Sequence, residues 1–372
     1  MTPTPAQDTR GPDGSRDRRG PGGADGPRDS GVRTALAALG RGGTATAALL
    51  LALIFVVIAT QNPSFFEGPP LMAFAKKAAP LVILAIGQYL VIVSGEFDLS
   101  VGSLVGAQVV VAARFIDGQE PMTLPVIGLM AALGLVVGLV NGLVTTLLRV
   151  PSIITTLGTM LILFGAVRYW TGGAPTGALS ESFRVPGRHG IEGVPFLGEI
   201  PWALVIALVL AAGAVLLMRS PFGRSLMATG DNDVAAAFSG VRVWRVRTMA
   251  FVGSSLMATV AAILIGGYAG VTAQVGDGLE FAAITAVVLG GVVLGGGRGT
   301  VVAAVLGALT VEALFTLFNQ LYLPSTIQPS VQGLIIIAAV AYAARRGDLR
   351  LPERLRRRPD HPTERPLGTS RR

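Results

Sequence analysis

The sequence has no cysteine, which excludes disulfide bonds, cysteine-bound zinc and iron–sulfur clusters. Charge is also scarce, because 14% of the 372 residues are charged, whereas a typical soluble domain has about 25%. The two histidines, His189 and His361, fall in a predicted loop and a predicted tail. No metal-ligand cluster, nucleophile–base pair or carboxylate dyad is visible in the sequence, so we expect no metal, no cofactor and no catalytic centre in this chain.

Long apolar runs make up most of the chain, which is 51% hydrophobic with a mean hydropathy of +0.62. A helix needs about 20 mostly apolar residues to cross ~30 Å of hydrocarbon, and about ten runs approach that length. They lie at about residues 44–60, 71–94, 99–117, 123–148, 152–171, 201–218, 248–267, 282–297, 300–318 and 329–344. The sequence therefore predicts an all-α polytopic membrane protein.

Arginine is concentrated in the two tails and in a few loops. The composition of residues 1–43 and 346–372 predicts disordered tails on either side of a membrane domain at 44–345. Arg149, Arg298 and the loop 219–247 fall on the same predicted side as both tails, opposite the predicted extramembrane loop 172–200. Cytoplasmic loops carry an excess of Lys and Arg. We therefore expect both termini in the cytoplasm, and we attribute the net charge of +8 to membrane orientation rather than to nucleic-acid binding.

The stretch Val93–Gly106, V-S-G-E-F-D-L-S-V-G-S-L-V-G, places two carboxylates and two serines between two apolar runs. Two interpretations of it remain open. It is either a cytoplasmic turn in which Asp98 or Ser100 caps the next helix, or a broken helix whose polar groups line a solute route. The predicted topology puts it at the cytoplasmic ends of two spans, so Glu96 and Asp98 need not be deeply buried.

The basic loop 219–247 contains signals for a short helix. Asp231 and Asn232 are good N-caps, Val234–Ser239 can form a helix, and Gly240 is a natural stop. Phe238 is the one large apolar side chain of that helix. The segment is either a surface helix that joins two spans or a docking helix for a cytosolic partner.

A glycine-rich element at Ala283–Gly299 suggests phosphate binding at first sight. A P-loop needs G-K-[ST], however, and the only lysines are Lys76 and Lys77. The chain therefore has no Walker A site, and its glycines are expected to permit tight turns. Other glycines four residues apart predict close helix packing: Gly102 and Gly106, Gly134, Gly138 and Gly142, and Gly291 and Gly295.

Three motifs resemble the permease subunits of ribose-, xylose- and galactose-type bacterial ABC sugar importers. The first is G-x-x-D-L-S-V-G-S, here with Phe97 before the aspartate where the family more often has isoleucine. The second is A-x-G-x-N-x-x-A-A-x-x-S-G-V from Ala228 to Val241, and the third is A-x-x-A-V-V-L-G-G-x-x-L-x-G-G-x-G. The resemblance implies a type II importer permease in the bacterial inner membrane that moves a small sugar by alternating access.

The same resemblance implies partners and site residues. Cytosolic ATPase subunits would dock on the second motif, an extracytoplasmic binding protein would deliver sugar, and a second permease copy, identical or homologous, would complete the pathway. The predicted docking residues are Ala228, Gly230, Asp231, Asn232, Asp233, Ala236, Phe238, Ser239 and Gly240. The predicted signature or pathway residues are Gly95, Glu96, Asp98, Ser100, Gly102 and Ser103, with Gln88 and Asn141 as further polar positions.

Other functions remain as alternatives. The same architecture serves autoinducer sugars, nucleosides and branched-chain amino acids, although the D-L-S-V-G spelling disfavours the last two. An ion-coupled secondary transporter would be favoured by buried, pairable charges within the spans.

Overall fold

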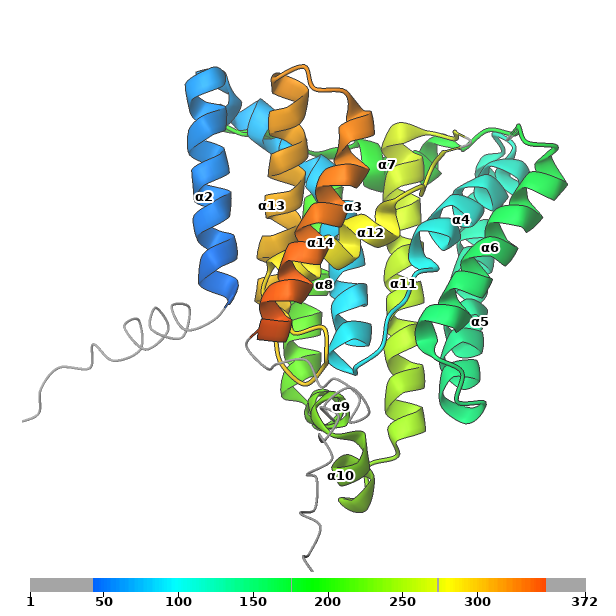
Figure 1. The fold of residues 1–372 in the computed structure, drawn as a ribbon. Helices are drawn as coiled ribbons and strands as arrows, with labels where there is room; N and C mark the ends of the chain where they lie inside the picture. The colour runs from blue at the N-terminus through cyan, green and yellow to red at the C-terminus, as the bar shows by residue number, and fades with distance from the viewer. Residues whose placement is uncertain (1–42, 175, 273, 346–372) are drawn as a thin grey trace, which may run out of the picture. The chain divides into compact units, whose positions relative to one another are not determined.

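The computed structural model describes residues 43–174, 176–272 and 274–345, and these form a helical bundle with one small hairpin (Figure 1). The first half contains α2 (Gly43–Gln61), η1 (Pro63–Phe66), α3 (Gly68–Val93), α4 (Val101–Ile116), η2 (Glu120–Met122), α5 (Thr123–Leu147) and α6 (Ser152–Thr171). The region predicted as an extramembrane loop, 172–200, contains α7 (Glu181–Arg188) and strand β1 (Gly190–Val194), which pairs antiparallel with β2 (Gly198–Pro201). The second half contains α8 (Trp202–Arg219), α9 (Pro221–Asp231), α10 (Asp233–Phe238), α11 (Val243–Ala269), α12 (Leu279–Leu289), α13 (Val301–Gln320), η3 (Ser325–Ile327) and α14 (Gln328–Arg345).

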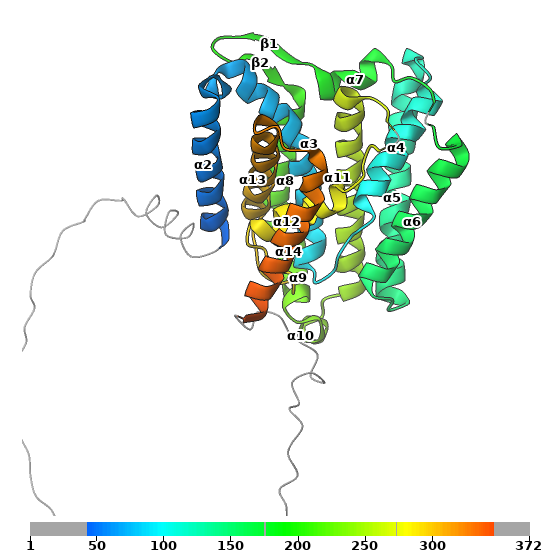
Figure 2. The same ribbon diagram turned by 45° about the horizontal axis from the view of Figure 1, so that its top comes forward.

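Two opposite ends of the bundle can be told apart. The hairpin and α7 lie at one end, whereas α9 and α10 lie at the other (Figures 1 and 2). The first residues of α2 and the last residues of α14 both point towards the end that carries α9 and α10. We call this the cytoplasmic end, because the arginine-rich loop 219–247 lies there, and the opposite one the outer end.

Seven of the described helices are long and apolar enough to cross a membrane: α2, α3, α5 together with η2, α6, α8, α11 and α13. Two further apolar helices, α4 and α12, are shorter. Sixteen and eleven residues rise about 24 and 16 Å at 1.5 Å per residue, which is less than the ~30 Å of a hydrocarbon core. The predicted all-α membrane fold is confirmed, whereas the count of about ten complete spans is not.

The run at 282–297 is not one helix. α12 ends at Leu289, and the next residues form turns in which Gly291, Gly296 and Gly297 all adopt positive φ. Glycine alone enters this region without a steric penalty. The predicted helix-packing face at Gly291 and Gly295 is therefore wrong, because both residues lie beyond the helix.

The core is centred on α3 and α11. From Ala78 to Val93 every residue of α3 is buried, and α3 packs against α8, α11, α12 and α13. By contrast, α2, α6 and α8 expose most of their apolar surface, as expected of helices that contact lipid or another membrane subunit.

The glycines of α5 allow the backbone of α11 to pack closely against it, as predicted. A Cβ added to Gly138 would lie 2.6 Å from the Cα of Val252, and one added to Gly142 would lie 2.6 Å from the Cα of Thr248. Both obstacles are backbone atoms, so no side chain can rotate away to make room.

Replacing Gly138 by valine is therefore expected to separate α5 from α11. Overpacked interiors lose about 1–3 kcal/mol, and we expect a lower thermal unfolding midpoint for the purified protein in detergent. Gly158→Val is the matched control, because a Cβ at Gly158 meets nothing within 4 Å. Equal midpoints for the two variants would contradict this packing interpretation.

Candidate functional site

The signature stretch turns back into the bundle after α3. α3 ends at Val93, Gly95 takes a left-handed conformation with φ +89°, and residues 96–100 run without helix to the start of α4. Glu96 contacts Arg247 on α11, whereas Asp98 contacts Ser254, seven residues further along the same helix. Seven residues of helix rise about 10 Å. The segment therefore runs as non-helical backbone from the cytoplasmic end back into the bundle, a re-entrant geometry that Figure 1 shows in cyan.

Asp98 is fully buried, contrary to the expectation from topology. Its Oδ1 accepts hydrogen bonds from the backbone N–H of Ser100 at 3.0 Å and from the Ser100 hydroxyl at 2.6 Å. Its Oδ2 accepts one from the Ser254 hydroxyl at 3.0 Å. Ser100 is the N-cap residue of α4, but its side chain caps no helix N–H. The carboxylate therefore holds the non-helical segment against α11.

This network extends to α5 and α6. The Asn141 amide donates to the Ser100 hydroxyl at 2.9 Å, and the Thr159 hydroxyl donates to Asn141 Oδ1 at 2.6 Å. The backbone N–H of Phe97 donates to the Ser152 hydroxyl at 3.1 Å. Helices α5, α6 and α11 thus meet around the segment through neutral side chains and one carboxylate.

The other residues predicted near this pathway lie on α3 and α4. Gly102 is buried, and a Cβ there would collide with the Glu280 carboxylate and lie 2.6 Å from the Gly276 carbonyl oxygen. Ser103 is half-buried and lines a small cavity of about 40 Å³ beside α6. Gln88 is fully buried, and its amide has no hydrogen-bond partner among the residues that the structure describes.

The loop 219–247, which we call the docking loop after its predicted role, forms two helices, α9 and α10, and α10 is built as the sequence predicts. Asn232 caps α10 by accepting from the Ala235 N–H at 3.1 Å, and Gly240 follows the helix with φ +85°. Asp231, by contrast, is the last residue of α9 rather than a cap. Phe238 is 90% exposed at the cytoplasmic end. Of the other predicted docking residues, Ala236 is buried, Gly230 and Asn232 are half-buried, and the remainder are exposed: Ala228, Asp231, Asp233, Ser239 and Gly240.

All three motifs meet at one glycine junction. A Cβ on Gly296 would lie 2.9 Å from the Cα atoms of both Gly230 and Gly95, and one on Gly297 would lie 2.7 Å from the Cα of Asp231. The Gly297 N–H donates to the Val93 carbonyl oxygen at 2.9 Å. The glycine-rich element therefore packs the docking loop directly against the signature turn.

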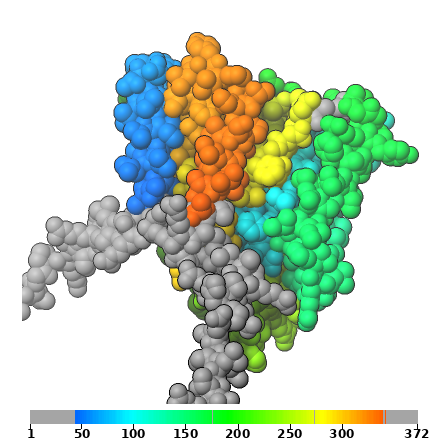
Figure 3. All heavy atoms as spheres, in the orientation of Figure 1, coloured from blue at the N-terminus to red at the C-terminus, as the bar shows by residue number. Residues whose placement is uncertain are grey.

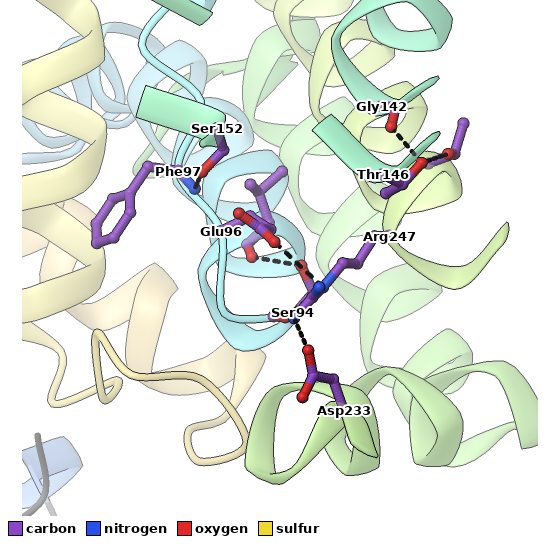
Figure 4. A network of polar contacts seen from close by, with 10 residues as sticks. Ser94, Glu96, Phe97, Gly142, Thr146, Ser152, Asp233 and Arg247 are labelled. Atoms are coloured by element: carbon purple, nitrogen blue, oxygen red, sulfur yellow. Dashed lines mark hydrogen bonds and ion pairs between the residues drawn. The ribbon is translucent and has the colours of Figure 1, made fainter. Parts of the chain in front are cut away.

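Arg247 joins the same two motifs by charge (Figure 4). Its Nε lies 3.2 Å from Glu96 Oε1, and its Nη2 lies 3.5 Å from Asp233 Oδ2 on α10. Its Nε also donates to the Ser94 carbonyl oxygen at 3.3 Å. We call Glu96, Asp233 and Arg247 the clasp. A cavity of about 870 Å³, the cytoplasmic cavity, opens beside the clasp between α10, the start of α11 and the turn after α5.

Comparisons with known proteins agree with this architecture. A family model described as "Branched-chain amino acid transport system / permease component" matches residues 71–340. The chain belongs to this permease family. No solved structure matches the chain.

The relatives of this permease include proteins named "Autoinducer 2 import system permease protein LsrC". One from Klebsiella pneumoniae is 36% identical over 293 residues, covering 78% of this chain and 83% of the relative. Another from Enterobacter sp. strain 638 is 34% identical over 303 residues, covering 81% and 86%. A third from Escherichia coli K12 is 32% identical over 301 residues, covering 81% and 86%.

The resemblance to permease components of ABC sugar importers is thereby confirmed. The permease is a multi-pass protein of the bacterial inner membrane, and family membership implies an ATPase on a separate subunit and a binding protein as partners. The family description names branched-chain amino acids, whereas the named relatives import autoinducer 2, one of the alternative solutes predicted from the sequence.

Sequence reasoning overlooked two buried carboxylates in the permease, Glu280 on α12 and Glu312 on α13. Glu312 on α13 has a side chain that is 8% exposed, and its Oε1 lies 2.9 Å from the Nζ of Lys77 on α3. The signal was present, because Glu312 is a lone carboxylate inside the apolar run 300–318. Lys76, its neighbour in sequence, instead donates to the Arg188 carbonyl oxygen at 2.7 Å.

Proposed function

We propose that this permease forms the route by which an ATP-driven importer moves a small neutral solute of the sugar or autoinducer-2 type. The observation that carries the proposal is the re-entrant segment 96–100, which brings the Asp98 carboxylate and the Ser100 hydroxyl into the bundle beside the Asn141 amide. Non-helical backbone is tolerated at membrane depth only where protein buries it or where it lines a cavity. Broken helices are also the usual substrate-lining elements of transporters.

Apart from the Asp98 carboxylate, the side chains hydrogen-bonded around Ser100 are neutral. Ser100, Asn141 and Thr159 offer hydroxyl and amide groups, which both donate and accept hydrogen bonds. Such groups suit a neutral polyhydroxylated solute that must pass without being held tightly. The cytoplasmic cavity beside the clasp provides an exit on the same side as the docking loop.

Two ATPase subunits are proposed to dock on residues 228–241 of two permease copies. Phe238 is the proposed anchor, because an exposed aromatic side chain on a short capped helix fits a groove on a partner. ATP binding and hydrolysis would then bias the permease between outward-open and inward-open states through the different affinities of the ATPase for the two.

A second permease copy, identical or homologous, is proposed to cover the face that carries α4 and α12. Between the orange surface of α14 and the green surface of α6, Figure 3 shows yellow and cyan surface from these shorter helices and the segments beside them. Non-helical backbone facing lipid leaves polar groups unsatisfied at a cost of several kcal/mol each. A partner protein on this face removes that cost.

The docking proposal predicts that Phe238→Asp prevents assembly of the permease with its ATPase subunit. Loss of an aromatic anchor removes about 2 kcal/mol or more of binding energy, which is roughly 30-fold in affinity. Co-purification and ATP-driven uptake both report it. Phe196→Asp is the matched control, because Phe196 is 97% exposed on the outer hairpin. Normal assembly of the Phe238 variant would refute the docking role.

The importer itself is tested by reconstitution with its ATPase and binding protein in proteoliposomes. We expect uptake of at least one of D-ribose, D-xylose, D-galactose and autoinducer 2 that needs ATP and is indifferent to an imposed proton gradient. A binding screen on the partner solute-binding protein identifies the solute. Uptake that continues without the ATPase would favour the ion-coupled alternative, for which the Lys77–Glu312 pair is the specific observation.

A further inference from the structure

A second cavity lies in the outer half of the bundle, far from the docking loop. It has a volume of about 360 Å³ and is enclosed by parts of α3, α11, α12, α13 and α14 together with the residues just before α12 and α14. We call it the outer cavity. Its polar lining includes Lys77, Tyr268, Asp277, Glu312, Gln328 and Gln332.

The Lys77–Glu312 pair is the costly feature of this cavity. Glu312 is buried, whereas the Lys77 side chain is 46% exposed and borders the cavity. Charged residues inside membrane spans are expensive and mark solute or ion pathways. A well-packed apolar pair is often as stable as a buried ion pair or more so. Packing alone therefore gives no reason to keep a carboxylate in the middle of α13.

The lining favours a neutral solute with several hydroxyl groups. One ammonium and two carboxylates face the cavity, so a free anion would meet Asp277 and Glu312, and a free cation would meet Lys77. A hydroxyl group can accept from an ammonium and donate to a carboxylate, and the amides of Gln328 and Gln332 can do both. A volume of about 360 Å³ is near the lower end of ligand pockets, which suits a small molecule.

We propose that the outer cavity is a transit site that binds a small neutral polyhydroxylated solute on its way from the binding protein. This inference rests on the proposed function and adds a place and a set of ligating groups to it. Lys77 would donate to one solute hydroxyl, Glu312 would accept from another, and Tyr268 would supply a further hydroxyl from α11.

The absence of native cysteine makes the site directly testable. Gln328→Cys places one thiol in the cavity, and Phe196→Cys places one on the outer hairpin as a control. Each variant, in the full complex in nanodiscs, is labelled with a charged methanethiosulfonate reagent in the presence of D-ribose, D-xylose, D-galactose or autoinducer 2. Sucrose at equal osmolarity is the solute control. The labelling rate of the cavity thiol is the measurement.

We expect one of the four solutes to slow labelling at position 328 and to leave labelling at position 196 unchanged. At a concentration of twice its Kd the slowing is about threefold, because two thirds of the sites are then occupied. Slowing by sucrose as well would show a non-specific effect and overturn the site.

Transport kinetics provide the second arm. Tyr268→Phe, and Lys77→Met combined with Glu312→Gln, are expected to raise the KM for uptake with little change in the maximal rate. The double variant removes both members of the ion pair together, so neither is left without its partner. Lys76→Met is the matched control, because Lys76 bonds to the Arg188 carbonyl oxygen and does not line the outer cavity.

The two proposals fail in different ways. If the complex imports a solute, but that solute gives no protection at position 328 and the variants keep their KM, the transit site is wrong and the function stands. If ATP is hydrolysed, none of the four solutes is imported and none protects, the proposed solute class is wrong. Protection without import would keep the site and refute the importer.

Discussion

Replacing Arg247 by glutamate is expected to uncouple ATP hydrolysis from solute uptake. Arg247 lies between Glu96 of the signature segment and Asp233 of the docking helix, at 3.2 and 3.5 Å. A glutamate there puts a third carboxylate where a guanidinium held the other two. We infer that the clasp transmits movement of α10 to the re-entrant segment, because Arg247 pairs with one carboxylate from each of the two motifs.

The expected size of the effect of Arg247→Glu follows from the coupling free energy between linked sites. Such coupling is typically about 1–3 kcal/mol, which corresponds to roughly 5- to 150-fold. The ratio of solute imported to ATP hydrolysed should decrease by a factor within that range, while co-purification with the ATPase is retained. Arg247→Lys should give an intermediate ratio, because a single ammonium lacks the planar fork of donors that reaches both carboxylates.

The matched control for the clasp is Arg245→Glu. Arg245 is an exposed neighbour on α11 whose guanidinium lies over the Trp244 ring, 5.0 Å from its centroid. The two variants make the same charge change at the same end of the bundle, so a general electrostatic effect on ATPase docking would move both. An unchanged ratio of import to hydrolysis in Arg247→Glu would remove the clasp from the coupling mechanism.

Local signals predicted the docking loop well. The Asn232 cap, the short helix after it and the stop at Gly240 depend on residues within a few positions of one another, so local chemistry decides them. The glycines of α5 were also informative, because a stripe of residues four apart can face only one neighbouring helix.

Hydropathy was misleading where the backbone leaves the helix inside the bundle. The apolar run predicted at 282–297 ends in glycines that form turns, and composition alone does not show where hydrogen bonding along a helix stops. The depth of Asp98 was likewise hidden, because it is set by Ser254, which lies 156 positions further along the chain. Arg247 and Glu96 are also brought together only by the tertiary fold.

Asp98 yields the second large prediction, the loss of transport in Asp98→Ala. Three hydrogen bonds end on this buried carboxylate, two from Ser100 and one from Ser254. Removing an acceptor from a buried donor costs about 1–3 kcal/mol for each group left unsatisfied. Because α3, α4 and α11 keep their own packing, we expect the bundle to remain folded while residues 96–100 lose their fixed position. ATP-driven uptake should then fall below detection.

Asp98→Asn separates hydrogen bonding from charge at the same position. The asparagine oxygen can still accept both bonds from Ser100, and the Ser254 hydroxyl can turn to accept from the new amide. Substantial uptake in Asp98→Asn and none in Asp98→Ala is therefore the result expected if the side chain positions the segment. Ser254→Ala, which removes one of the three bonds, should fall between the two. If Asp98→Asn folds normally and is as inactive as Asp98→Ala, the negative charge itself acts on the solute or on an ion, and the positioning role is wrong.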